Sequence, residues 1–112
     1  MDISIEPRGA ATIVRVVGSM DGITADTLLL ALQQQIDAGN VRLVADLTDV
    51  AYTSSAGLRS LLATVKLARQ RGGDLRLAAA IPAVHRVLEL SGFTTILKMY
   101  GAVDDAVASF SA

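Results

Sequence analysis

Apolar and polar residues alternate over the first part of the chain. Ile3 and Ile5 are separated by polar neighbours, which is the period of a strand with one buried face. A second strand is predicted at 11–17. The residues 7–9 between them, Pro-Arg-Gly, have the composition of a turn, so the two strands are expected to form a hairpin.

The period changes after the hairpin. Residues 18–22 are a glycine-punctuated loop, and a helix is predicted from its cap, Thr24, to about Asp37. Ile23 and Leu28 have the spacing of a hydrophobic staple, in which a residue before the cap packs against the start of the helix. Strands and helices then alternate, with strands expected at 41–47, 74–79 and 95–100 and helices at about 55–71, 82–90 and 104–110.

This alternation favours an α/β fold with parallel crossovers. Several strands alternate apolar with polar residues, unlike the continuous apolar runs of a sheet that is buried on both faces. If the right-handed crossovers all advance in one direction, their helices lie on a single face. We therefore expect a mixed sheet of about five strands with four helices packed mainly on one face, in a single domain over residues 1–112.

Composition narrows the classes of function. A hydrophobic content of 52% with 19% charged residues is typical of a globular protein. The net charge of −1 and the scattered Lys and Arg residues argue against direct nucleic-acid binding. The absence of cysteine excludes disulfides, thiolate metal sites and a cysteine nucleophile. The start of the chain has no secretory pattern and no apolar run approaches about 18 residues, so we expect a cytoplasmic protein without membrane insertion.

The segment 46–58 carries the candidate chemistry. It begins at the end of a predicted strand and leads into leucines at helical spacing. The small residues between them leave room for another backbone to approach. Ser54 is the predicted N-cap, which places Ser55 in the first helical turn, where free N–H groups and the helix dipole favour negative charge. A hydroxyl at this point is well placed to carry a phosphate.

This motif, together with the loop 18–21 and the segment 88–93, resembles the STAS domain of bacterial anti-sigma-factor antagonists. The resemblance covers nearly the whole chain and implies the family's mixed sheet with helices on one side. It implies that Ser55 is the phosphorylated serine. Ser54 has a hydroxyl group of its own beside it and is therefore a competing acceptor. The partner-binding residues that it implies are Asp21, Thr53, Ser54, Ser55, Ala56, Gly57 and Arg59.

The resemblance also implies a mechanism of signal transduction by partner switching. The unphosphorylated protein would bind an anti-sigma factor that is a serine kinase, which would release the sigma factor and so regulate transcription. Phosphorylation of Ser55 would end this complex, and a PP2C-type phosphatase would restore it. ATP and Mg²⁺ would belong to the kinase, so this chain is expected to be no enzyme and to hold no cofactor.

Three residues depart from the family pattern. Ser54 stands where many antagonists have aspartate, Ala56 where a serine is often found, and Arg59 where glycine is frequent. The missing carboxylate bears on the efficiency of phosphoryl transfer. Arg59 is one turn beyond Ser55, where it either reaches back to a phosphate or lies on a solvated helix surface. The alternative functions within the family are an accessory subunit of a lipid-transporting ABC complex and a part of another signalling assembly.

Other candidate chemistry has simpler explanations. Asp21, Asp46 and Asp49 lie near predicted strand ends, where clustered carboxylates can hold Mg²⁺. Turn aspartates commonly bond their own backbone instead, so we expect no metal site. His85 is the only histidine, and it is expected to be a surface residue or a packed ring with no catalytic role. A Ser-His-Asp triad would have to use it, and its sequence neighbours have the character of an ordinary helix surface.

Overall fold

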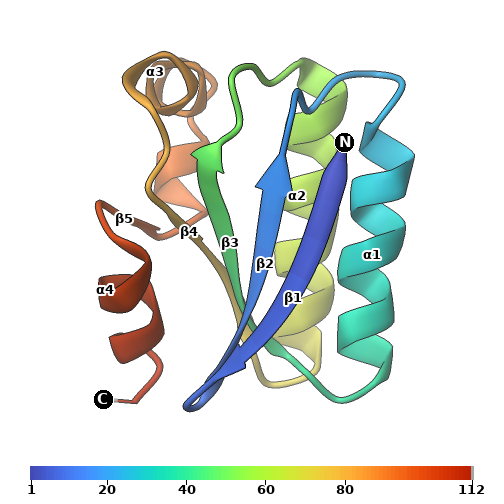
Figure 1. Cartoon of the computed structure of the whole chain (residues 1–112), viewed down its shortest axis with the longest axis vertical. Coiled ribbons are helices and arrows are strands. Elements are labelled where there is room, and N and C mark those ends of the chain that lie inside the picture. Colours follow the sequence, from blue (N-terminus) through green and yellow to red (C-terminus); the bar gives the residue numbers. More distant parts are fainter. Residues whose placement is uncertain (112) are drawn as a thin grey trace.

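Figure 1 shows the computed structural model of the chain, which describes residues 1–111. Strands and helices alternate after an N-terminal hairpin. The elements in chain order are β1 (Asp2–Arg8), β2 (Ala11–Val17), α1 (Ala25–Asp37), β3 (Arg42–Asp49), α2 (Ser55–Gln70), β4 (Asp74–Ala78), α3 (Pro82–Leu90), the short 3₁₀ helix η1 (Phe93–Thr95), β5 (Met99–Tyr100) and α4 (Val103–Ala108).

The strands form one mixed sheet in the order β1-β2-β3-β4-β5. β1 runs antiparallel to β2, and every later neighbouring pair is parallel. Each crossover therefore advances by one strand in the same direction, and right-handed crossovers of this kind place their helices on the same face. The predicted α/β fold, with a mixed sheet of five strands and four helices, is confirmed.

The helices cover the two faces of the sheet unequally. α1, α2 and α3 share the larger core, in which Leu28, Leu61 and Leu88 are completely buried. α4 contributes Ala106 to a smaller core on the opposite side of the sheet, where it packs with Ile13 and other strand residues. Three of the helices thus pack on one face, as expected, and the short α4 covers part of the other.

The hairpin differs from its prediction at the turn. Pro7 and Arg8, which were expected in the turn, are the last residues of β1. The connection consists of Gly9 and Ala10, and Gly9 has a φ of +57°. Pro7 is accommodated because β1 is an edge strand of the sheet. Such a strand has a partner on one side only, so a residue without an N–H group loses no hydrogen bond on the other side.

The strand predicted at 95–100 is mostly replaced by a local turn. Gly92 has a φ of +76°, and η1 follows it directly. The N–H groups of Ile96 and Leu97 both donate to the carbonyl oxygen of Phe93, at 3.0 and 2.8 Å. Because these bonds keep the backbone in a turn as far as Leu97, only β5, which is two residues long, pairs with β4.

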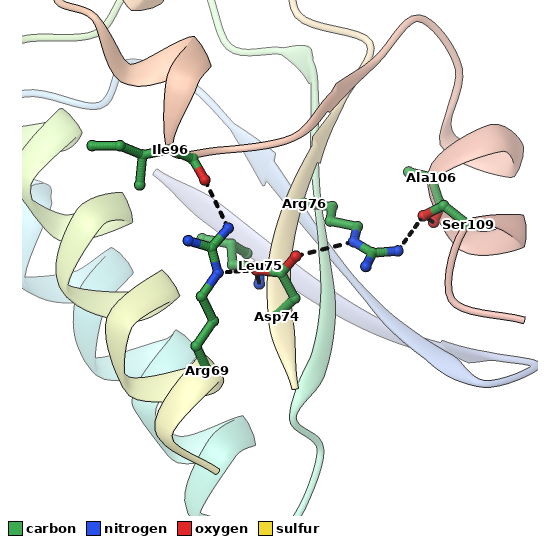
Figure 2. Close-up of polar contacts among 7 residues, drawn as sticks. All are labelled: Arg69, Asp74, Leu75, Arg76, Ile96, Ala106 and Ser109. Atoms are coloured by element: carbon green, nitrogen blue, oxygen red, sulfur yellow. Dashed lines mark hydrogen bonds and ion pairs between the residues drawn. The ribbon is translucent and has the colours of Figure 1, made fainter. Parts of the chain in front are cut away.

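Asp74, the first residue of β4, is a buried carboxylate with two arginine partners (Figure 2). Arg69 of α2 donates through Nε to Asp74 Oδ1 at 2.9 Å and through Nη2 to the carbonyl oxygen of Ile96 at 2.7 Å. Arg76 donates through Nε to Asp74 Oδ2 at 3.1 Å and through Nη1 to Ser109 Oγ at 2.7 Å. A buried charge is tolerated when it is paired and hydrogen-bonded. This network joins α2 and β4 to the C-terminal part of the chain.

Candidate functional site

Two loops meet at the carboxyl ends of β2 and β3. We call residues 18–24, between β2 and α1, the Asp21 loop, and residues 50–54, between β3 and α2, the serine loop. The N–H of Met20 donates to the carbonyl oxygen of Tyr52 at 2.9 Å, and the N–H of Ser54 donates to that of Met20 at 2.7 Å. A parallel β-bridge also pairs Met20 with Thr53. The two loops are therefore fixed to each other, and Met20 is completely buried beneath them.

Gly57, in the first turn of α2, lies directly against this junction. A Cβ atom at this position would stand 2.8 Å from Met20 Cβ, from Met20 O and from Thr53 Oγ1. Cβ atoms do not approach other heavy atoms so closely, and Met20 O belongs to the backbone and cannot turn aside. Glycine is therefore required here by close packing, as expected from the small residues of the motif.

Three hydroxyl side chains follow one another at the start of α2, in different environments. Thr53 is buried, with 3% of its surface exposed. Ser54 is half-buried and is the N-cap of α2, as predicted, because its Oγ accepts a long hydrogen bond from the N–H of Gly57 at 3.4 Å. Ser55 is the first residue of α2 and is exposed. Of the three hydroxyls, Ser55 is the one that another protein reaches most freely.

The surroundings of Ser55 favour an anion. α2 is 16 residues long, and its first turn contains no acidic residue. The unsatisfied N–H groups of that turn carry the positive end of the helix dipole. Arg59 is exposed four residues further on, the spacing at which helix side chains are neighbours, and no carboxylate of residues 1–111 forms an ion pair with it. A phosphate on Ser55 would meet backbone donors and have a guanidinium within reach.

The carboxylate of Asp21 bonds the backbone of its own loop. Its Oδ1 accepts hydrogen bonds from the N–H of Ile23 at 2.9 Å and from the N–H of Thr24 at 3.0 Å. These bonds to the ionised carboxylate, that from Thr24 first, lower the pKa of Asp21 below its ordinary value. Thr24 Oγ1 donates to the carbonyl oxygen of Ser19 at 2.8 Å, which closes the loop from the other side.

The start of α1 differs from its prediction in two respects. Thr24 occupies the N-cap position, but its hydroxyl makes no capping bond because it is bonded within the Asp21 loop. The staple between Ile23 and Leu28 is wrong: Leu28 is completely buried, whereas Ile23 is 90% exposed. Met20 enters the core from this loop instead, and the bonds to Asp21 hold the backbone of Ile23 at the surface.

A groove of about 410 Å³ separates the first turns of α1 and α2. Small residues make up much of its wall, including Gly22 from the Asp21 loop and Ala56 beside Ser55. Asp26 of α1 and Arg59 of α2 give it one acidic and one basic side chain. The groove thus adjoins the Asp21 loop through Gly22 and the start of α2 through Ala56, the residue after Ser55.

The remaining candidate residues are engaged elsewhere. Asp21 bonds the backbone of its own turn, as expected, whereas Asp46 lies within β3, where its Oδ1 accepts from the N–H of Thr48 at 3.1 Å. Asp49 forms an ion pair with Arg15 at 2.5 Å. Residues 1–111 contain no group of three potential metal ligands. His85 is half-buried and lies 3.2 Å from Glu89 on the same helix. Within the same residues, every helix is too short or too polar to cross a bilayer.

Sequence reasoning missed two exposed apolar residues beside the site. Ile23 is 90% exposed in the Asp21 loop, and Tyr52 is 54% exposed in the serine loop. A signal for Ile23 was present, because an aspartate two residues before it is typical of a turn in which the carboxylate binds the following N–H groups. That turn competes with the predicted staple, because the staple requires the side chain of Ile23 to point into the core.

The architecture defines a class: a small α/β domain that presents a serine at a helix N-terminus beside a fixed loop. A family model described as the STAS domain matches residues 2–106. The chain belongs to the STAS domain family, which confirms the resemblance seen in its sequence.

Relatives of known name agree with this assignment. BtrV of Bordetella bronchiseptica, provisionally named an anti-sigma factor antagonist, is 34% identical over 98% of this chain and 95% of its own length. The anti-sigma F factor antagonist of Paenibacillus polymyxa is 30% identical over 89% of this chain and 86% of its own. A crystal structure of an anti-sigma factor antagonist from Mycobacterium paratuberculosis matches with a TM-score of 0.90 and 28% identity, covering 99% of this chain and 94% of that one.

Proposed function

We propose that this protein is an anti-sigma factor antagonist whose binding is switched off by phosphorylation of Ser55. The observation that supports this most is the exposure of Ser55 at the N-terminus of α2, while Thr53 is buried and Ser54 caps the helix. In this proposal the unphosphorylated protein binds an anti-sigma factor that is also a serine kinase, and that binding releases the sigma factor.

The chain acts in this scheme as substrate and switch, in the cytoplasm, as a single domain over residues 1–112. The kinase supplies ATP and Mg²⁺, and a PP2C-type phosphatase returns the protein to its binding form. The chain itself supplies no catalytic group and no cofactor.

The switch works through the surface and not through unfolding. A phosphate adds about −1.5 to −2 charges, and on Ser55 it would lie beside the N–H groups of the first turn of α2, which stabilise negative charge. In the complex the same phosphate would lose water against the partner, and that loss is unfavourable unless the partner compensates for it. Phosphorylation should therefore weaken the complex while the domain stays folded.

The proposed contact surface has an outer and an inner set of residues. Those with exposed or half-buried side chains would touch the partner, and they are Ser54, Ser55, Ala56 and Arg59. Thr53 and Gly57 are buried and would set the shape of the serine loop from beneath. Asp21 would hold the neighbouring loop through its bonds to backbone N–H groups.

The acceptor is tested by incubating the protein with its anti-sigma factor kinase and ATP and locating the phosphate by mass spectrometry. We expect phosphate on Ser55 in the wild-type protein and in Ser54→Ala, and none in Ser55→Ala. Phosphate found only on Ser54 or Thr53 would contradict the assignment.

The switch is tested by titration calorimetry with the same kinase. Ser55→Asp should bind far more weakly than Ser55→Ala, because aspartate places a charge in a contact that must lose water. Both variants should melt within a few degrees of the wild type, since charge at a helix N-terminus is worth about 0.3–1 kcal/mol in the stabilising direction. Equal affinities of the two variants would instead favour an accessory subunit of a transporter or another signalling assembly.

A further inference from the structure

Ile23 is the most exposed large apolar side chain among residues 1–111, at 90% of its surface. Exposed apolar residues are common singly, but this one does not lie on a loosely held segment. Its own N–H donates to Asp21 Oδ1. The next residue, Thr24, donates through its N–H to Asp21 Oδ1 and through its Oγ1 to the carbonyl oxygen of Ser19. The loop is fixed further by the junction of Met20 with the serine loop.

This combination is unfavourable for the isolated chain. Ile23 has the staple position before α1, but Met20 fills the core beneath the loop and the Asp21 turn holds Ile23 in water. Burying a side chain of this size is worth roughly 1.5–3 kcal/mol. A fixed loop that presents an apolar side chain loses little conformational entropy when a partner covers it, which favours binding.

The surroundings of Ile23 indicate where that partner sits. Gly22, its neighbour in the chain, and Ala56, the neighbour of Ser55, line the same groove between α1 and α2. Asp26 and Arg59 lie on opposite walls of that groove and are both exposed. A protein that covers this groove would therefore lie beside Ile23 at one wall and beside Ser55 at the other.

We propose that Ile23 is the apolar anchor of the antagonist–anti-sigma factor complex. This inference rests on the proposed function and identifies the chemistry of the partner's face. That face carries an apolar hollow that accepts the branched side chain of Ile23. It also carries a carboxylate that meets Arg59 and a basic group that meets Asp26, in keeping with the charges of the groove.

An apolar contact at Ile23 also explains how a phosphate on Ser55 would weaken the complex. An apolar contact stabilises a complex only if water leaves it, and a doubly charged group nearby holds water strongly. Gly22, the chain neighbour of Ile23, and Ala56, the chain neighbour of Ser55, line one groove, so a partner that covers the groove would pass beside both residues. A phosphate on Ser55 would then oppose the loss of water from the contact at Ile23. The effects of Ile23→Ala and Ser55→Asp on affinity should therefore be less than additive, as for residues that share one contact.

The test compares Ile23→Ala with Leu30→Ala in titrations with the anti-sigma factor. Leu30 is a matched control, because it is 57% exposed on α1 but lines a different groove, formed with Met1, Ile3 and Ile5 of the N-terminal segment. We expect Ile23→Ala to weaken binding about 30-fold, the size of an interface hot spot, and Leu30→Ala to change it less than about threefold. Neither variant should change the melting temperature appreciably, since both side chains are exposed.

Salt separates the apolar anchor from the charged groups. The loss caused by Ile23→Ala should be the same at about 0.05 M and about 0.5 M salt, whereas the loss caused by Arg59→Ala should shrink as salt screens the charges. An Ile23 effect that disappears in high salt would contradict an apolar contact.

The outcomes distinguish this inference from the proposed function. Tight binding by the wild type with equal affinity of Ile23→Ala would overturn the anchor and leave the proposed function standing. A wild-type protein that does not bind any anti-sigma factor would overturn both. If sedimentation shows a dimer that Ile23→Ala converts to a monomer while anti-sigma factor binding is unchanged, the occupant is a second copy of this chain and the inference is wrong.

Discussion

The contact of Gly57 with the two loops predicts a large effect from one added methyl group. In Gly57→Ala the new Cβ would lie 2.8 Å from Met20 Cβ, Met20 O and Thr53 Oγ1. Met20 and Thr53 are 0% and 3% exposed, so neither can move outward without opening the core. The hydrogen bond from Ser54 N–H to Met20 O, now 2.7 Å long, would have to lengthen as the loops separate.

The two opposing contributions can be estimated. Overpacking of this kind costs about 1–3 kcal/mol, and replacing glycine by alanine in a helix recovers up to about 1 kcal/mol. We therefore expect a net loss of about 1–2 kcal/mol in the free energy of unfolding. For a domain of this size the melting temperature should fall by roughly 4–16 °C.

Calorimetry or circular dichroism of Gly57→Ala measures this fall, and Gly22→Ala is the matched control. Gly22 belongs to the Asp21 loop, has an ordinary φ, and nothing lies within 4 Å of the position of its Cβ. The control should stay within about 0.5 kcal/mol of the wild type. A Gly57→Ala protein that melts at or above the wild-type temperature would refute the claim that close packing here requires glycine.

Three further changes test the structure elsewhere. Ala79 has a φ of +59°, which disfavours a Cβ, so Ala79→Gly should raise the free energy of unfolding by about 1 kcal/mol in urea titrations; an unchanged midpoint would show that the backbone is unstrained. Asp74→Ala removes the carboxylate between Arg69 and Arg76 and should cost about 3 kcal/mol in the same assay, while a loss below about 1 kcal/mol would show that water replaces the carboxylate. The lowered pKa of Asp21 means that its ionised form stabilises the fold above about pH 4, and this contribution is lost as the pH falls through the folded pKa. Asp21→Asn should therefore be less stable than the wild type at pH 7 and converge with it in acid, and a stability difference that is independent of pH would contradict the role of the charge.

Much of the local structure was predictable because its causes are local. α1 ends at Asp37, just before Gly39 with its φ of +94°, and α3 begins at Pro82, the first-turn position that suits proline. The cap at Ser54 depends on a bond to Gly57, three residues away, and it follows from residue type and spacing. The place of Ser55 in the first turn of α2 follows from that cap.

The order of the elements, the α/β class and the serine at the start of α2 could therefore be predicted, since they depend on hydrophobic period and on contacts within a few residues. The surroundings of that serine depend on contacts between distant parts of the chain. Met20 and Gly57 are 37 residues apart in the chain, and only the parallel pairing of β2 with β3 brings them into contact. The same pairing and the turn at Asp21 leave Ile23 in solvent, because the core position beneath the loop is filled by Met20. Local spacing specifies which residues can pack inward, but competition for the core, which involves distant strands, determines which of them do.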